Sequence, residues 1–96
     1  MYKISNDGGR PAFEFDMAKS NSNKRKHGID FVEAQALWDD ERRVEILART
    51  VDEPRFVVIG RIAGTFWSAV TTDRQGRTRL ISVRQARPEE VALYEG

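Results

Sequence analysis

The second half of the chain changes to a two-residue period, and this limits the folds open to it. Apolar and polar residues alternate there, or form short β-branched runs, as is typical of strands. The predicted strands are residues 44–48, 56–59, 65–72 and 78–83. Short turns at residues 63–64 and 73–76 separate the last three. Because parallel strands need long crossovers, we expect these four strands to form an antiparallel sheet.

The first half predicts two helices. Asp16 is a good N-cap residue, and Gly28 suits the left-handed position after a helix C-terminus. A helix of about three turns is therefore expected between them. Asp30 and Glu33 have the spacing of a capping box, which predicts a second, amphipathic helix over residues 31–38.

The ends of the chain complete the expected organisation. Residues 1–12 read as a flexible N-terminal arm, followed by an alternating triplet at residues 13–15 that could form a short strand. Residues 88–94 predict a short terminal helix, since proline and glutamates suit a first turn. Residues 13–96 are thus expected to form one α+β domain, with two N-terminal helices on a four-stranded antiparallel sheet and a short C-terminal helix.

Composition excludes several classes of protein. With 40% hydrophobic and 32% charged residues, a globular domain is favoured over disorder. The chain has no cysteine, which excludes disulfides and thiolate metal sites. Its single histidine and scattered carboxylates give no metal-ligand spacing, so no metal or cofactor is expected. Residues 1–12 lack the apolar core of a signal peptide, and no apolar run could span a membrane, so a soluble, cytoplasmic protein is expected.

Charge is unevenly distributed along the chain. Residues 1–27 carry six Lys/Arg against three acids, residues 28–54 carry three against eight, and residues 55–96 carry seven arginines against four acids. If the fold brings the two basic segments together, it will present a basic face to polyanions. The alternative is the ordinary mixing of charges on a protein surface.

The arginines after residue 54 are the strongest candidates for anion binding. They are Arg55, Arg61, Arg74, Arg77, Arg79, Arg84 and Arg87. Arginine without lysine suits bidentate recognition of phosphate, although strand arginines also commonly cover apolar surface with their stems. In a regular strand, Arg77, Arg79, Ile81 and Val83 would share one side.

Four side chains are candidates for proton transfer. His27 could act as a general acid or base, although a lone histidine at a helix C-terminus more often pairs with free carbonyls. Lys26 could equally be a solvated charge, Glu53 one more member of the acidic segment, and Tyr94 a residue that packs on the core.

Several spaced residues resemble the signature of one family. They are Phe15-Asp16, Lys19, Asn23, Lys26-His27-Gly28-Ile29, Phe31 and Ala34, followed by Glu53, Arg55, Ile59-Gly60, Arg74, Arg79 to Arg84, Ala86, Glu90 and Tyr94. Together they resemble the BrnT toxin family over roughly residues 13–94. Phe15 and Met17 depart from it, since the family usually has Trp and often Pro at these positions.

The resemblance implies a RelE-like fold and a ribonuclease that inhibits translation and growth by cutting RNA. It also implies a cognate BrnA-type antitoxin, a ribbon-helix-helix DNA-binding protein that neutralises the toxin, is expected in a heterotetramer with it, and alone contacts operator DNA.

The expected mechanism is metal-independent attack of a ribose 2′-hydroxyl on the neighbouring phosphate, with no cofactor. The catalytic candidates are His27, Glu53, Arg74, Arg79, Arg84 and Tyr94. The RNA-binding candidates are Lys19, Lys24, Lys26, Arg55, Arg61 and Arg77. The alternatives are a non-catalytic RNA- or partner-binding module with the same basic face and, less favoured, a metal-dependent nuclease using the acidic segment.

Overall fold

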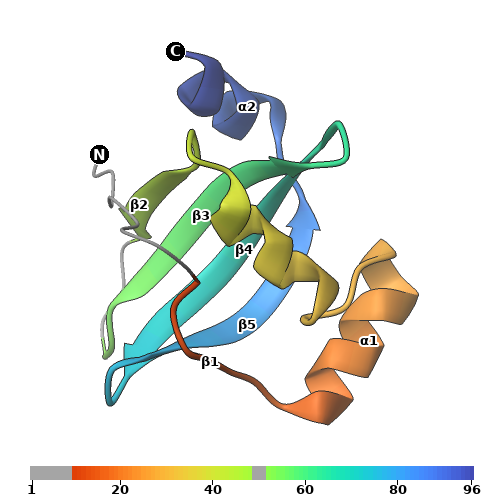
Figure 1. Ribbon diagram of the computed structural model, residues 1–96, viewed down its shortest axis with the longest axis vertical. Helices are drawn as coiled ribbons and strands as arrows, with labels where there is room; N and C mark the ends of the chain where they lie inside the picture. Colours follow the sequence, from red (N-terminus) through yellow and green to blue (C-terminus); the bar gives the residue numbers. More distant parts are fainter. Residues whose placement is uncertain (1–9, 49–51) are drawn as a thin grey trace.

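The computed structural model describes residues 10–48 and 52–96. Within these ranges the chain forms a sheet of order β1-β5-β4-β3-β2 (Figure 1). The elements are β1 (Phe13–Glu14), α1 (Met17–His27), the 3₁₀-helix η1 (Glu33–Asp39), β2 (Val44–Ala48), β3 (Arg55–Ile62), β4 (Thr65–Arg74), β5 (Arg77–Gln85) and α2 (Pro88–Glu95). Among the described residues, no helix has the length and apolar character needed to cross a membrane.

The antiparallel meander is confirmed, but the prediction of a four-stranded, wholly antiparallel sheet is wrong. β2 to β5 pair in sequence order, each antiparallel to the next. β1 adds a fifth strand parallel to β5, with Phe13 opposite Thr78 and Glu14 opposite Arg79. Short connections force antiparallel pairing only between consecutive strands, whereas β1 reaches β5 after most of the domain and is free to run parallel.

The tight turns have the backbone that their sequences predict. Ala63 and Gly64 both have positive φ, of 50° and 86°, between β3 and β4. Gln75 and Gly76 do the same between β4 and β5, with φ of 51° and 79°. Two successive left-handed residues match the right-handed twist of a hairpin, and glycine supplies one of each pair without steric cost.

Helix α1 begins and ends where its caps predict. The Asp16 carboxylate accepts from the Lys19 backbone amide, and Gly28 adopts the left-handed conformation with φ of 83°. The helix has almost no apolar face and buries only Ser20 and Asn23. A helix of this composition depends on tertiary contacts rather than on its own propensity.

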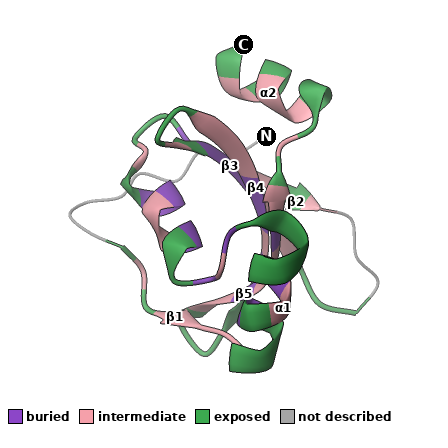
Figure 2. Ribbon diagram, turned by 90° about the vertical axis from the view of Figure 1, so that its right-hand side faces the viewer, coloured by how far each residue is buried: buried purple, intermediate pink, exposed green. Residues whose placement is uncertain are grey.

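Helix η1 starts at the predicted capping box but is a 3₁₀-helix, not the expected α-helix. The Glu33 amide donates to the Asp30 carboxylate, and the Asp30 amide donates to the Glu33 carboxylate. Figure 2 shows η1 beside one face of the sheet, with part of its ribbon coloured as buried, and the buried residues are Ala34, Leu37 and Trp38. The core on this face consists of Ile29, Phe31, Ala34, Leu37, Trp38, Val58, Ala69, Leu80 and Val83.

The predicted N-terminal arm falls largely on residues 1–9, which lie outside the described residues. At its described end, the Arg10 guanidinium donates to the Asp39 carboxylate at 2.6 and 2.9 Å. The Ala12 carbonyl accepts from the Thr78 amide, which extends the contact between this segment and β5.

Candidate functional site

An irregularity in β5 decides which way its arginines point. Val70 pairs with Ser82, but Thr71 pairs with Leu80, so Ile81 is an extra residue in the ladder. Leu80 and Val83 therefore both face the core, three residues apart. The expectation that Val83 shares a side with Arg77 and Arg79 is wrong, because a bulge reverses the alternation that a regular strand would keep.

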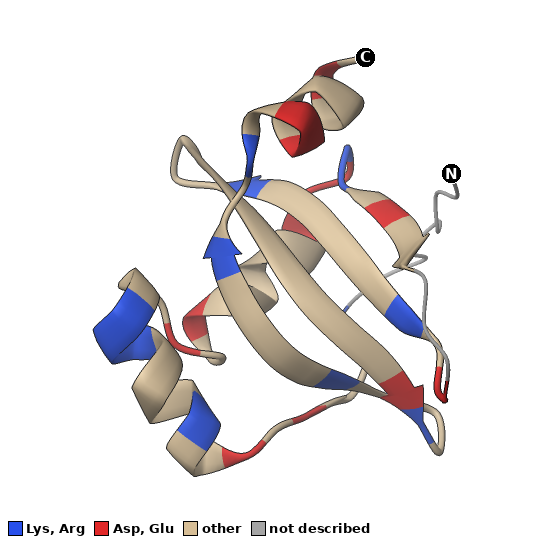
Figure 3. Ribbon diagram, turned by 180° about the vertical axis from the view of Figure 1, so that it is seen from behind, with Lys and Arg blue, Asp and Glu red and all other residues tan. Residues whose placement is uncertain are grey.

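The same bulge brings Arg84 onto the side of Arg77 and Arg79. Directly paired residues of neighbouring strands have their side chains on the same face of the sheet. The pairing of β5 with β4, and of β4 with β3, therefore identifies the other residues on this face. Every arginine of the described strands lies on the face opposite η1, which we call the arginine face: Arg55, Arg61, Arg74, Arg77, Arg79 and Arg84. The charged strand residues on the face covered by η1 are Glu45 and Asp73. Figure 3 looks onto the arginine face, with η1 behind the sheet.

At one end of the arginine face, two arginines share a carboxylate that sequence reasoning missed. The Arg79 Nη1 donates to Glu14 Oε2 at 2.9 Å, and Arg74 Nη1 lies 3.9 Å from the same oxygen. The Glu14 side chain is 27% exposed. The alternation of Phe13-Glu14-Phe15 could have revealed it, because it turns Phe13 to the core and Glu14 to the opposite face.

Two further predicted residues lie near this end. Arg55 directly precedes Phe56 in β3, and Phe56 pairs with Thr71 of the antiparallel strand β4. Arg55 is therefore level with Thr72, which pairs with Arg79 of β5. Its guanidinium is 3.6 Å from the Glu53 carboxylate, and both side chains are about half exposed. Arg77 is exposed and forms no ion pair with any other described residue.

At the other end of the face, Arg84 is held by helix α2. Its two terminal nitrogens donate to the two oxygens of Glu90 at 2.7 and 2.9 Å. Glu90 also accepts from the Ser68 hydroxyl and from the Arg87 amide. These donors lower the pKa of Glu90 to about 2, and the Arg84 guanidinium has the largest effect.

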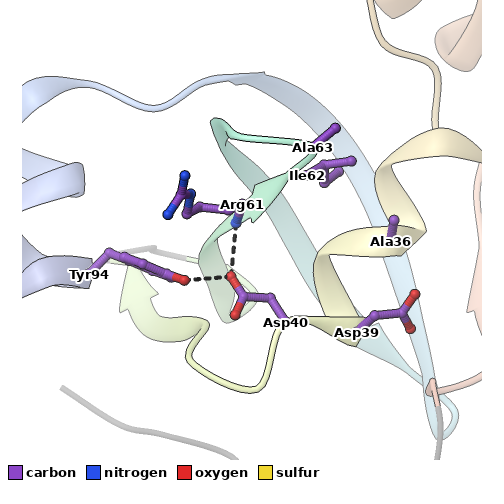
Figure 4. A pocket seen from close by; sticks show the side chains of 7 residues that line it. All are labelled: Ala36, Asp39, Asp40, Arg61, Ile62, Ala63 and Tyr94. Atoms are coloured by element: carbon purple, nitrogen blue, oxygen red, sulfur yellow. Dashed lines mark hydrogen bonds between the residues drawn. The ribbon is translucent and has the colours of Figure 1, made fainter.

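Tyr94 and Arg61 meet beside a pocket of about 440 Å³. The Tyr94 hydroxyl donates to Asp40 Oδ2 at 2.8 Å, and the Arg61 backbone amide donates to the same oxygen at 2.9 Å (Figure 4). Burial and this bond to a carboxylate both raise the pKa of Tyr94. Burial opposes ionisation of Asp40, but the amides of Arg61 and Arg42 and the Tyr94 hydroxyl outweigh it and lower its pKa. The Arg61 guanidinium stacks on Phe66, 5.0 Å from the ring centre.

Asn23 places the basic helix at the edge of β5. Its amide nitrogen donates to the carbonyls of Val83 and Ile29, each at 2.8 Å, and its oxygen accepts from the Val83 amide at 3.1 Å. The side chain thus pairs with β5 as a neighbouring strand would. The Ser20 hydroxyl oxygen accepts a further hydrogen bond from the Phe31 amide. Polar residues that look unsuited to a helix are therefore the ones that dock it.

Docking leaves the basic side chains of α1 on the surface. Lys19, Lys26 and His27 are exposed and form no ion pair with other described residues, whereas Lys24 donates to Glu33 at 2.8 and 3.0 Å. His27 ends the helix, one turn beyond Asn23, whose side chain is bonded to Val83. Figure 3 shows α1 beside β5 at the border of the arginine face.

The predicted catalytic residues thus fall into three groups. Arg74 and Arg79 lie together at Glu14, and the pair of Glu53 and Arg55 lies near them. Arg84 is about 15 Å farther along β5, at the end that also carries Tyr94. His27 stands apart on α1. Within residues 10–48 and 52–96, no three histidine, aspartate or glutamate side chains gather as a metal-binding group.

A small α+β domain with one arginine-rich sheet face, bordered by a basic helix, has the charge distribution that is typical of proteins that bind polyanions. Comparison with protein-family models identifies the chain more closely. Residues 15–90 match the model described as "Ribonuclease toxin, BrnT, of type II toxin-antitoxin system". The chain therefore belongs to the BrnT family of ribonuclease toxins, and this family implies an RNA substrate and an antitoxin partner. A comparison with curated proteins gives no match.

Proposed function

We propose that this chain is a metal-independent endoribonuclease that cuts RNA by attack of a ribose 2′-hydroxyl on the adjacent phosphate. One observation carries the proposal: all arginines of the described strands project from one sheet face. A row of guanidinium groups matches the repeating phosphates of RNA and can bind them in bidentate geometry. Damage to translation by this activity would inhibit growth.

The reaction places excess negative charge on the phosphorane, which nearby cations stabilise. Arg74 and Arg79 suit this task because they already converge on one oxygen atom. Arg84 could add to it only if Glu90 gives up its two hydrogen bonds. Arg55, Arg61 and Arg77 would contact phosphates farther along the strand.

The basic helix would extend the RNA path beyond the sheet. Lys19 and Lys26 are exposed next to β5 and would bind the backbone without reading its sequence. Lys24 would contribute less, because Glu33 already neutralises it. Proton transfer is proposed for His27, Lys26, Glu53 or Tyr94.

The decisive experiment compares two short RNAs that differ only by a 2′-deoxyribose at the cut site. The purified protein, freed of antitoxin, should cleave the all-ribose strand and leave the substituted strand intact. Cleavage should continue in excess EDTA. Cutting at the deoxyribose position would exclude attack by a 2′-hydroxyl. If EDTA abolished the activity and added divalent metal restored it, metal independence would be excluded.

We further propose that the partner is a BrnA-type antitoxin, which forms a heterotetramer with the toxin in the cytoplasm and alone contacts operator DNA. Family membership supports a partner of this kind. Expression of this chain should arrest growth, and co-expression of the small neighbouring reading frame should relieve the arrest. Light scattering of the co-purified complex would give its stoichiometry.

A second candidate function is a non-catalytic RNA-binding module. It is favoured by the separation of His27, Glu53 and Tyr94, since proton donors and acceptors for one reaction must lie close together. It predicts that the purified chain binds RNA with a strong dependence on salt and leaves the RNA intact.

A further inference from the structure

The arginine face contains one carboxylate that comes from a described strand. Glu14 is the acidic residue of the described strands that projects from this face, and it lies between two arginines rather than in the core. A purely phosphate-binding surface would gain affinity without it, because a carboxylate repels the ligand. Its position therefore points to a role in the reaction, not in binding.

The geometry assigns to Glu14 the role of general base in the cleavage we have proposed, and this assignment rests on that proposed function. Glu14 Oε2 accepts a hydrogen bond from Arg79, whereas no described residue forms a hydrogen bond with Oε1. One oxygen of the carboxylate is thus fixed and the other remains able to accept a proton. A phosphate held by Arg74 and Arg79 would lie beside this oxygen, within reach of a 2′-hydroxyl on the same nucleotide.

Other proton acceptors are placed less well. Glu53 contacts Arg55, the Tyr94 hydroxyl is bonded to Asp40, and His27 ends a separate helix. In the described part of the chain, none of these three contacts Arg74 or Arg79. Glu14 is the carboxylate that touches both, and β1 fixes it through its parallel pairing with β5.

The proposed step is balanced as follows. The 2′-hydroxyl gives its proton to the free oxygen of Glu14, and the resulting 2′-oxygen forms a bond to phosphorus. The bond from phosphorus to the 5′-oxygen breaks, and the departing 5′-oxygen takes a proton from water. The products are a 2′,3′-cyclic phosphate and a 5′-hydroxyl, and Glu14 then returns its proton to solvent.

The test measures single-turnover cleavage and RNA binding separately, using an RNA with one 2′-deoxyribose as the uncleavable ligand. Glu14→Gln should lower the cleavage rate at least about 100-fold, the usual contribution of a general base. It should bind the uncleavable RNA as tightly as the unmodified chain or more tightly, because a negative charge has been removed. Glu14→Asp, which keeps the carboxylate but shortens its reach, should retain intermediate activity. Glu41→Gln makes the same change at an exposed position outside the sheet and should leave both quantities unchanged.

The outcomes separate the assignment from the function on which it rests. If the cleavage rate of Glu14→Gln is within about threefold of that of the unmodified chain, Glu14 is not the base. If cleavage is then lost only in Glu14→Ala, Glu14 is a residue that positions Arg79. If Glu14→Gln loses binding together with cleavage, its role is structural and the assignment is also overturned. If the unmodified chain binds RNA but never cleaves it, the proposed ribonuclease function fails first, and the base assignment fails with it.

Discussion

Replacing Glu90 by glutamine tests how helix α2 is held against the sheet. The Glu90 carboxylate receives both terminal nitrogens of Arg84, the Ser68 hydroxyl and the Arg87 amide, and its side chain is only 13% exposed. None of the residues of α2 is fully buried. This carboxylate is therefore one of the main attachments of the helix to the sheet, and glutamine keeps the shape of the side chain while removing its charge.

The magnitude follows from the pKa of Glu90, which its partners lower from 4.5 to about 2. At about 1.4 kcal/mol per pH unit, this corresponds to at most about 3.5 kcal/mol of stability. Because the folded-state pKa is depressed, the contribution is complete above pH 4.5 and is lost as the pH falls toward about 2. Glu90→Gln should therefore unfold more easily at pH 7, by about 2–3 kcal/mol, since the charge of Arg84 also loses its partner.

Urea unfolding of both proteins at several pH values between 7 and 2 measures this difference. Other carboxylates titrate in the same range, so the informative quantity is the gap between the two free energies of unfolding. The gap should close toward pH 2. Glu89→Gln, at the exposed neighbouring position, should show no such gap. A gap that stays constant down to pH 2 would refute the assignment of this stability to the Glu90 carboxylate.

Three further predictions test the docking of α1, its cap and the arginine face. Asn23→Ala should destabilise the fold by about 3 kcal/mol or more in urea unfolding, because it leaves buried backbone groups of β5 unpaired. Asn21→Ala, on the exposed side of the same helix, should cost less than about 1 kcal/mol. Gly28→Ala should cost about 1 kcal/mol in the same assay, since its φ of 83° strains any residue with a Cβ, and an unchanged midpoint would contradict this. Arg77→Ala should weaken binding to single-stranded RNA and reduce the salt slope by about 0.7, whereas Arg42→Ala, outside the sheet, should change neither.

Much of the fold could be predicted because its signals are local. The caps at Asp16 and Gly28, the capping box at Asp30 and Glu33, and the two hairpin turns each depend on neighbours within a few residues. Such signals are written in the chain and need no tertiary context. The parallel pairing of β1 is not of this kind, since it joins residues 65 positions apart.

The candidate site was harder to predict for the same reason. Residue types identified the arginines, but alternation assigned Arg84 and Arg79 to opposite sides, and only the bulge at Ile81 unites them. The alternation at residues 13–15 turns Glu14 away from the core, but nothing local marks Arg74 and Arg79, 60 and 65 positions away, as its partners. Tyr94, 54 positions from Asp40, likewise acquires its hydrogen bond only in the folded chain.

The sequence by itself determined the order of helices and strands, the caps and turns, and the supply of arginine in the second half. Tertiary structure decided which face those arginines share, which of them are neutralised by a carboxylate, and where the basic helix docks. The physical reason is the range of the interactions. Backbone conformation follows from steric and hydrogen-bonding preferences of adjacent residues, whereas a binding face depends on strand register, and one inserted residue reverses the side to which every later side chain points.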